Sequence, residues 1–240
     1  MKSKYVKYFY KSGEVTVFLS MMCLVICGLI FSIIKSAKLQ YQKLLIEISV
    51  ESALKSAMSE YNKELFEKYG LLFVDTTYKG VTDGGDESFI NHLSQYIDIN
   101  LEQYNTGGNP LCYISSSVNK SEYADANNHE LVANQIVNYM SNIYKDDSSF
   151  SDDDLIEKYI LLKFGEDVDS ENENTIESKI NEMSSEEKIV YCVDLITKEM
   201  RDTAYDEFNF SNLLSEVSVT VFISTDSEKI YECTKSYTLN

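Results

Sequence analysis

The chain is poor in the side chains from which catalytic and metal sites are most often built. Its 240 residues include two histidines, one proline and no tryptophan. His92 and His129 lie in no HExxH pattern and beside no cysteine at a metal-ligand spacing, so we expect both to be surface residues. The sequence also lacks the nucleophile-elbow, P-loop and dinucleotide-binding motifs. These absences argue against an enzyme and predict no catalytic residue, no cofactor and no metal.

Basic residues are scarce as well, with 21 Lys and Arg against 39 Asp and Glu and a formal net charge of −18. Nucleic-acid phosphates require a basic protein face, so we expect no nucleic-acid partner. The acidic run Asp146–Asp154 is no EF-hand loop, because Ser151 stands where that loop needs a glycine. We interpret Asp146–Asp154 and Asp167–Glu177 as exposed loops or solvated helix starts.

Charge is missing altogether from one stretch, the twenty residues Val15–Ile34. A helix rising about 1.5 Å per residue would span the roughly 30 Å hydrocarbon core of a bilayer over this length. A cleavable secretory signal is the alternative, but its apolar core is shorter, about 7–15 residues, and ends at a small-residue cleavage site. Val15–Ile34 runs instead into Lys35. The sequence therefore predicts a single-pass membrane protein with its transmembrane helix at 15–34.

Lysines near the uncharged stretch set the expected orientation. Residues 1–14 carry four of them, whereas the chain from Lys35 onward is strongly acidic. Basic residues beside a membrane segment stay in the cytoplasm. We therefore expect residues 1–14 to be a cytoplasmic basic segment, and the C-terminal domain to lie outside the cell membrane.

Helix-breaking residues are absent from Ser36 to Tyr69, and Gly70 stands where a helix would stop. This predicts one helix from about Glu14 to Tyr69, of about 55 residues and about 80 Å. Its part at 35–70 would continue outside the membrane.

Small side chains crowd two turns of this predicted helix. They predict close approach of another element and so a candidate helix-packing surface, with incidental good helix composition as the alternative. The residues are Ser49, Ser52, Ala53, Ser56 and Ala57.

Residues 71–240 predict an extracytoplasmic α+β domain. Leu71–Val74 is apolar enough for a short buried strand, and alternating apolar residues in 217–223 and 230–239 predict a β-hairpin that ends the chain. A further strand is expected from Leu111, and helices are expected near 87–103, 129–144, 152–164 and 185–205. Ser184 and Glu187 are predicted to form a capping box at the start of the last helix. The predicted fold class is α+β, with a long N-terminal transmembrane and stalk helix before the domain.

The five cysteines fall into two groups. Cys23 and Cys27 lie in the uncharged stretch, where we interpret them as small apolar packing residues. Cys112, Cys192 and Cys233 lie outside it, and three cysteines allow at most one intramolecular disulfide. A bond between Cys192 and Cys233 is one candidate, while pairing of either with Cys112, or no disulfide at all, stays open.

Two segments near the N-terminus resemble a known group of bacterial membrane proteins. The first is Lys11–Ser20 with the apolar span after it and Ser36–Leu39, and the second is Glu60–Phe73, EYNKELFEKYGLLF. Both resemble TadE/TadG-like, pseudopilin-like membrane proteins of tight-adherence (Flp-type) pilus clusters, particularly a Gram-positive family. The resemblance covers residues 11–75.

The resemblance implies a non-enzymatic minor component that assembles a pilus or a related secretion apparatus. Its expected partners are the membrane and other pilus or secretion-system subunits, in homo- or hetero-oligomers formed through the long helix. Pilins are cut after a glycine, which makes Gly13 and Glu14 the candidate processing junction. Pilins also carry a characteristic glutamate near the start of the mature helix, and in this chain Phe18 occupies that position. The alternative function is a permanently anchored extracytoplasmic binding module for a small ligand or an envelope partner.

Overall fold

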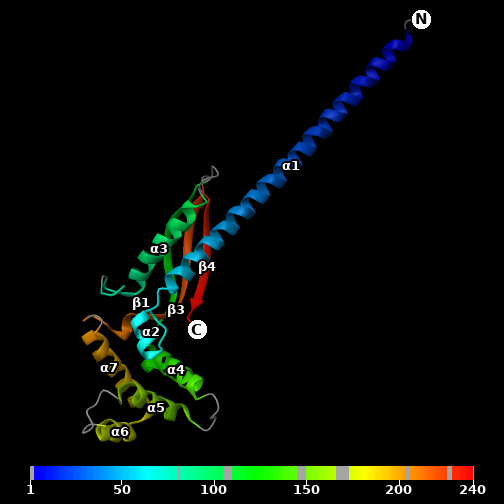
Figure 1. Ribbon diagram of the computed structural model, residues 1–240. Coiled ribbons are helices and arrows are strands. Elements are labelled where there is room, and N and C mark those ends of the chain that lie inside the picture. The colour runs from blue at the N-terminus through cyan, green and yellow to red at the C-terminus, as the bar shows by residue number, and fades with distance from the viewer. Residues whose placement is uncertain are drawn as a thin grey trace. The chain divides into compact units, whose positions relative to one another are not determined.

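The computed structural model describes residues 3–80, 82–104, 110–144, 150–165, 173–203, 206–225 and 229–239. By its internal packing the chain divides into two units, Met1–Ile48 and Ser49–Asn240. A long N-terminal helix precedes a mixed domain whose antiparallel sheet ends in a β-hairpin, so the predicted α+β class is confirmed (Figure 1).

Helix α1 runs from Ser3 to Met58 and contains 56 residues. The predicted helix had nearly this length, but both of its ends were wrong, since α1 begins before Glu14 and ends well before Tyr69. Most of α1 belongs to the first unit, and its last turns, from Ser49 onward, belong to the second.

Backbone pairing explains why α1 stops at Met58 although strong helix formers follow. Tyr61 forms an antiparallel bridge with Val74, and the Asn62 N–H donates to the Phe73 carbonyl at 2.8 Å. The Asn62 side chain accepts from the Leu65 N–H at 3.0 Å and caps the short helix α2, Lys63–Tyr69. Local helix propensity is therefore overridden here by backbone pairing with Phe73 and Val74, 11 to 13 residues further along the chain.

Gly70 ends α2 as the sequence predicted. Its backbone has φ +73°, and its N–H donates to the Phe66 carbonyl at 2.8 Å. A Cβ at this position would lie 2.5 Å from ring carbons of Tyr139. Both the left-handed conformation and the close approach of Tyr139 therefore require glycine.

The sheet is organised around strand β3, Leu213–Thr225, which pairs antiparallel with every other strand of the described sheet. Strand β2, Leu111–Tyr123, runs along one side of it, and β4, Ile230–Thr238, with the two-residue β1, Val74–Asp75, shares the other. The predicted hairpin is β3 and β4, and its turn at 226–228 lies outside the described residues. Of the predicted strand Leu71–Val74, only Val74 is in a strand.

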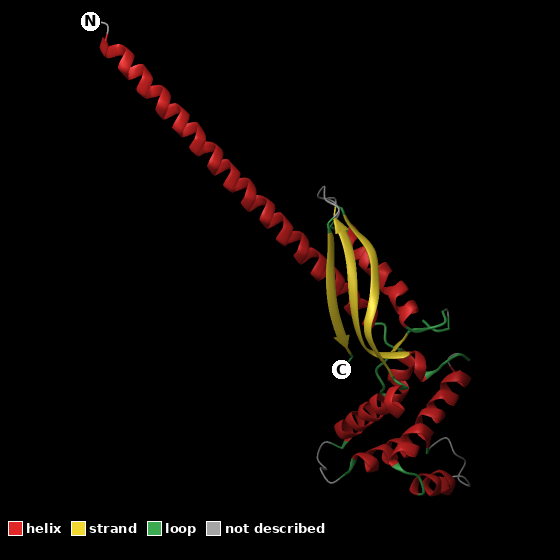
Figure 2. Cartoon of the chain, turned by 180° about the vertical axis from the view of Figure 1, so that it is seen from behind, coloured by secondary structure: helices red, strands yellow, loops and turns green. Residues whose placement is uncertain are grey.

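One face of this sheet is buried. Val217, Val219, Val221 and Ile223 of β3 are inaccessible to solvent and alternate with more exposed neighbours, as the period of two predicted. Helix α3, Asp86–Glu102, packs on the sheet and buries one apolar stripe (Figure 2). The stripe consists of Phe89, Leu93, Ile97 and Leu101.

The last turns of α1 join the same part of the domain. Val50, Ala53, Leu54 and Ala57 are buried at helical spacing. The Asn100 side chain of α3 donates to the Ser49 carbonyl at 3.1 Å, and Lys235 of β4 lies 3.3 Å from Glu51.

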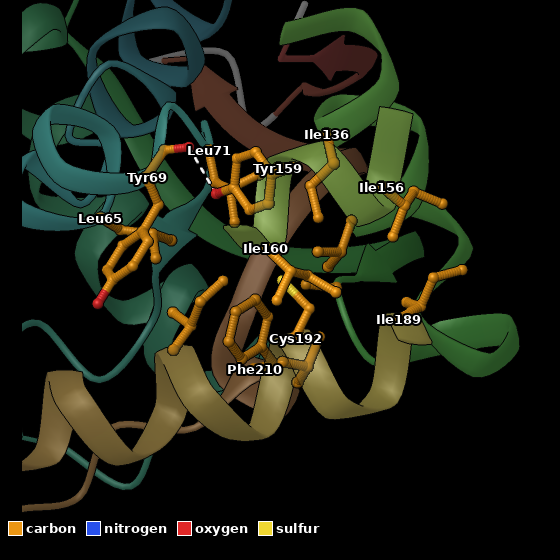
Figure 3. Packing of buried hydrophobic residues seen from close by; sticks show 14 of the residues in the cluster. Leu65, Tyr69, Leu71, Ile136, Ile156, Tyr159, Ile160, Ile189, Cys192 and Phe210 are labelled. Atoms are coloured by element: carbon orange, nitrogen blue, oxygen red, sulfur yellow. Dashed lines mark hydrogen bonds between the residues drawn. The ribbon is translucent and has the colours of Figure 1, made fainter. Parts of the chain in front are cut away.

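A second core lies among the remaining helices. In this core α2 and the residues that follow it pack with four helices and a 3-10 turn (Figure 3). These are α4 (Ala126–Ile143), α5 (Asp152–Phe164), α6 (Glu173–Asn181), α7 (Ser185–Thr203) and the turn η2 (Phe210–Asn212). The four predicted helices correspond to α3, α4, α5 and α7. Helix α6 was anticipated only as part of a solvated segment.

Two capping boxes begin helices in this second core. Glu187 accepts from the Ser184 N–H at 2.8 Å, so the predicted capping box is confirmed. Ser151 and Asp154 form another at the start of α5. The second half of the predicted acidic loop is thus a helix start, whereas 146–149 lie outside the described residues.

Candidate functional site

The most distinctive functional feature is the uncharged stretch of α1. Within the described residues, α1 is the one helix long and apolar enough to cross a membrane. Its apolar side chains between Val15 and Ile34 are exposed, with Leu24 at 73% and Phe31 at 71% of their full accessibility. A run of exposed apolar side chains this long is unfavourable in water, because moving apolar surface out of water lowers the free energy. The stretch is therefore consistent with a single membrane anchor.

The predicted helix-packing surface is largely taken up by the protein's own domain. Ser49, Ala53 and Ala57 are buried, Ser56 is half-buried and Ser52 is exposed. The small side chains do permit a close approach, but the elements that approach them belong to the second unit of the same chain. The three buried side chains therefore pack within their own domain, and a contact of this surface with another subunit stays a prediction.

The candidate processing junction lies inside helix α1. Gly13 and Glu14 are in regular helical conformation, and their side chains lie outside the described residues. Nothing in the fold tests cleavage there.

Cys192 and Cys233 are not joined by a disulfide in this structure, which is one of the alternatives that the sequence left open. Cys192 lies on α7 in the second core, where burial raises the pKa of its thiol well above the ordinary value. Cys233 lies on β4 opposite Val221, in the sheet. The two cysteines therefore belong to separate packing regions. Cys112 is exposed at the start of β2.

The Glu60–Phe73 segment is a structural junction. The Tyr159 hydroxyl of α5 donates to the Tyr69 carbonyl at 2.7 Å, and the Lys163 ammonium donates to the Lys68 carbonyl at 2.7 Å (Figure 3). The Gln135 amide of α4 accepts from the Leu72 N–H at 2.7 Å and donates to the Leu72 carbonyl at 3.0 Å. One short segment thus connects α4 and α5 through its backbone.

Helix α7 is tied to the same segment through a carboxylate. Glu199 accepts hydrogen bonds from the Lys68 ammonium and from the Tyr69 hydroxyl. Burial alone would raise the pKa of Glu199, but these two donors lower it below its ordinary value. The segment Glu60–Phe73, which is part of the resemblance, thus makes hydrogen bonds that hold α4, α5 and α7 together.

Both histidines have partners and are only half-exposed, unlike the surface residues that were expected. His92 lies 2.7 Å from a Glu60 carboxylate oxygen and against the Tyr78 ring, with centroids 4.0 Å apart. Glu60 also accepts from the Tyr96 hydroxyl, which raises the pKa of Tyr96 to about 12. His129 lies 3.2 Å from the Ala124 carbonyl through Nδ1.

A polar cavity of about 330 Å³ opens beside His92. Carboxylate, hydroxyl, amide and imidazole side chains line it, and none of its lining residues is Lys or Arg. The lining consists of Tyr78, Thr82, Asp83, Gly84, Glu87, Ser88, Asn91, His92 and Gln95. In the described part of the chain, no three His, Cys, Asp or Glu side chains group closely enough to hold a metal ion.

A second cavity, a groove of about 390 Å³, lies between α2 and α4. The spacing of Gln135, Asn138 and Asn142 places them on one face of α4, but the sequence does not show that this face lines a groove beside α2. Its lining consists of Phe66, Gly70, Leu72, Gln135, Asn138, Tyr139, Asn142 and Leu239. We refer to it as the α2–α4 groove.

Comparisons of the chain with protein families, with curated proteins and with solved structures return no match. The functional argument therefore depends on the residues and the geometry alone.

Proposed function

We propose that the protein is a membrane-anchored, non-enzymatic, minor pilin-like component that helps to assemble a Tad/Flp-type pilus or a related secretion apparatus. Residues 15–34 would anchor it in the cell membrane as a single pass, with residues 1–14 in the cytoplasm and the α+β domain outside. The resemblance over residues 11–75 suggests this role.

One observation carries the proposal: a single uninterrupted helix is exposed and uncharged over residues 15–34 and packs into a folded domain with its last turns. A helix of this kind joins an anchor to a domain without a flexible linker. Such a connection suits a subunit that must leave the bilayer together with its domain and pack beside similar helices.

Exposed apolar residues on α1 beyond the uncharged stretch support a role in helix packing. Tyr41, Leu44 and Ile48 are 59%, 52% and 46% exposed. Spacings of three and four residues place them on one side of the helix, flanked by the Lys43–Glu47 ion pair. We propose that this stripe replaces the buried small residues as the contact with a neighbouring subunit.

The intact mass and N-terminal sequence of the native protein, recovered from membranes and from the shed surface fraction, test the proposal. A mature chain that begins at Glu14 in the surface fraction would demonstrate prepilin-type processing after Gly13. A chain that keeps Met1 and occurs only in membranes would contradict a pilus subunit and favour a fixed anchored factor.

The packing stripe has its own test. Leu44→Asp places a charge at an exposed position, so the domain is expected to fold normally while co-purification with other apparatus subunits is lost. Lys43→Asp, on the flank of the stripe, is the control and is expected to keep co-purification. Equal behaviour of the two variants would contradict the assignment of the stripe.

A permanently anchored binding module is the second candidate function. The α2–α4 groove favours it, because its volume lies within the roughly 300–1,000 Å³ of typical ligand sites.

A further inference from the structure

The α2–α4 groove is free of charged side chains although the chain carries a net charge of −18. An anionic ligand would need Lys or Arg in the lining, and a cationic ligand would need a carboxylate. Neither is present among the lining residues. The polar cavity beside His92 differs in this respect, because Asp83 and Glu87 line it. The ligand chemistry that matches the groove is therefore neutral.

One wall of the groove is an exposed aromatic surface. Phe66 of α2 is 43% exposed, and Tyr61 next to it is 38% exposed. Their ring centroids lie 5.3 Å apart in an edge-to-face arrangement, which holds both rings in place. Of these two rings Phe66 is among the residues that line the groove, and Tyr139 contributes a lining ring from the α4 side. Rings that stay exposed at a groove offer a flat apolar face to a ligand.

The opposite wall is a row of amides on α4. Asn138 and Asn142 are exposed and lie one helical turn apart, and the Asn142 side chain donates to the Asn138 carbonyl at 2.9 Å. Gln135 is fully engaged with the Leu72 backbone and fixes the groove floor. Amide groups both donate and accept hydrogen bonds, so they can pair with hydroxyl and acetamido groups.

We propose that the α2–α4 groove binds a neutral saccharide. One face of the sugar ring, with its C–H groups, would lie against Phe66, and its hydroxyl or acetamido groups would hydrogen-bond Asn138 and Asn142. An apolar peptide would leave the amide row unpaired, at a cost in free energy, so it fits less well. The proposal does not depend on the pilus role.

The full-length protein provides the test by isothermal titration calorimetry. It is purified in a detergent without a sugar head group, such as dodecylphosphocholine, and titrated at physiological salt with tri-N-acetylchitotriose. The deacetylated, cationic trimer and a sulfated, anionic trisaccharide are the comparison ligands. Physiological salt limits the screening length to about 8 Å and suppresses non-specific attraction of the cationic trimer. Saturable binding of the neutral trimer alone is expected.

Variants locate the binding. Phe66→Ala and Asn138→Ala change exposed residues and are each expected to weaken binding about tenfold, or about 1.4 kcal/mol. Asn91→Ala removes an amide from the other cavity and is expected to leave binding unchanged. Thermal unfolding by circular dichroism establishes that each variant is folded.

Two outcomes would overturn the proposal. One is the absence of saturable binding of the neutral trimer up to its solubility limit. The other is binding that Phe66→Ala and Asn138→Ala leave as strong as in the native protein. Neither outcome changes the result expected from the N-terminal processing experiment. Failure of the saccharide proposal can therefore be distinguished from failure of the proposed pilus role.

Discussion

Two stretches of one helix have opposite surroundings. Residues 15–34 of α1 expose every apolar side chain, whereas the turn around Ala53 is buried in the domain. Both are equally regular helix. Their difference shows that the helical state does not reveal what a helix contacts. The amino-acid composition does indicate the surroundings, because the first stretch is apolar on all sides of the helix and the second is apolar on one stripe only.

The largest expected effect concerns the buried stretch. Ala53→Asp places a carboxylate at a site with no solvent access, and we expect a loss of about 4 kcal/mol or more in unfolding free energy. Ser52→Asp changes the neighbouring exposed residue and is the matched control, with a change expected within about 0.5 kcal/mol. Urea denaturation of both variants in detergent measures this difference. Similar midpoints for the two would show that Ala53 is not buried.

A charge in the first stretch should act on the membrane and leave the domain intact. Leu24→Asp is expected to weaken insertion by about 3 kcal/mol, the cost of an aspartate at a helix centre in the bilayer. Membrane flotation of the variant measures the loss. The unfolding midpoint of its domain should equal that of the native protein. A domain destabilised by Leu24→Asp would break the proposed separation of roles within α1.

Gly70 is where the sequence correctly predicted a helix stop, and its replacement tests the junction next to the buried stretch. Gly70→Ala combines an unfavourable left-handed conformation with a Cβ 2.5 Å from the Tyr139 ring, so we expect a loss of about 2–3 kcal/mol. The unfolding midpoint of Gly70→Ala measures it. If Tyr139→Ala restores much of the loss in a double variant, the steric part of the explanation is correct.

A stabilising change is expected at the first buried turn. The Ser49 hydroxyl is buried and has no hydrogen-bond partner among the described residues. Ser49→Ala removes this unpaired group and should raise the unfolding free energy by about 1 kcal/mol. Calorimetric melting provides the measurement. A lower melting temperature would mean that the hydroxyl has a partner, such as a water molecule.

The smallest effect concerns the rim of the buried stretch. Hydrogen bonds from Lys55 and then Lys235 lower the pKa of Glu51. A lowered pKa adds stability that is present above the ordinary pKa of the carboxyl and is lost as pH falls through the lowered value. Glu51→Gln should therefore melt slightly below the native protein at pH 7, and this difference should shrink as the pH falls below the ordinary pKa of the carboxyl. A difference in melting temperature that is larger at pH 3 than at pH 7 would contradict a lowered pKa of Glu51.

Periodic segments were predictable from the sequence, because their pattern reflects burial on one side. The alternation of Val217 to Ile223 and the capping box at Ser184 are examples. The break after Met58 was not predictable, because it depends on pairing of Tyr61 and Asn62 with Val74 and Phe73, which helix propensity does not reveal. The α2–α4 groove was missed for the same reason, since its two walls come from separate helices.

The position of β3 has a consequence for biosynthesis. The strand that pairs with β1, β2 and β4 is the second to last in the chain. No strand of the described sheet can find its partner until synthesis has reached residue 213. Strand β1 therefore waits unpaired while residues 76–212 are made, and β2 waits while residues 124–212 are made. A polypeptide of this design depends on its C-terminal hairpin to begin the sheet. A chaperone, or rapid completion of the chain, would protect the early strands from aggregation.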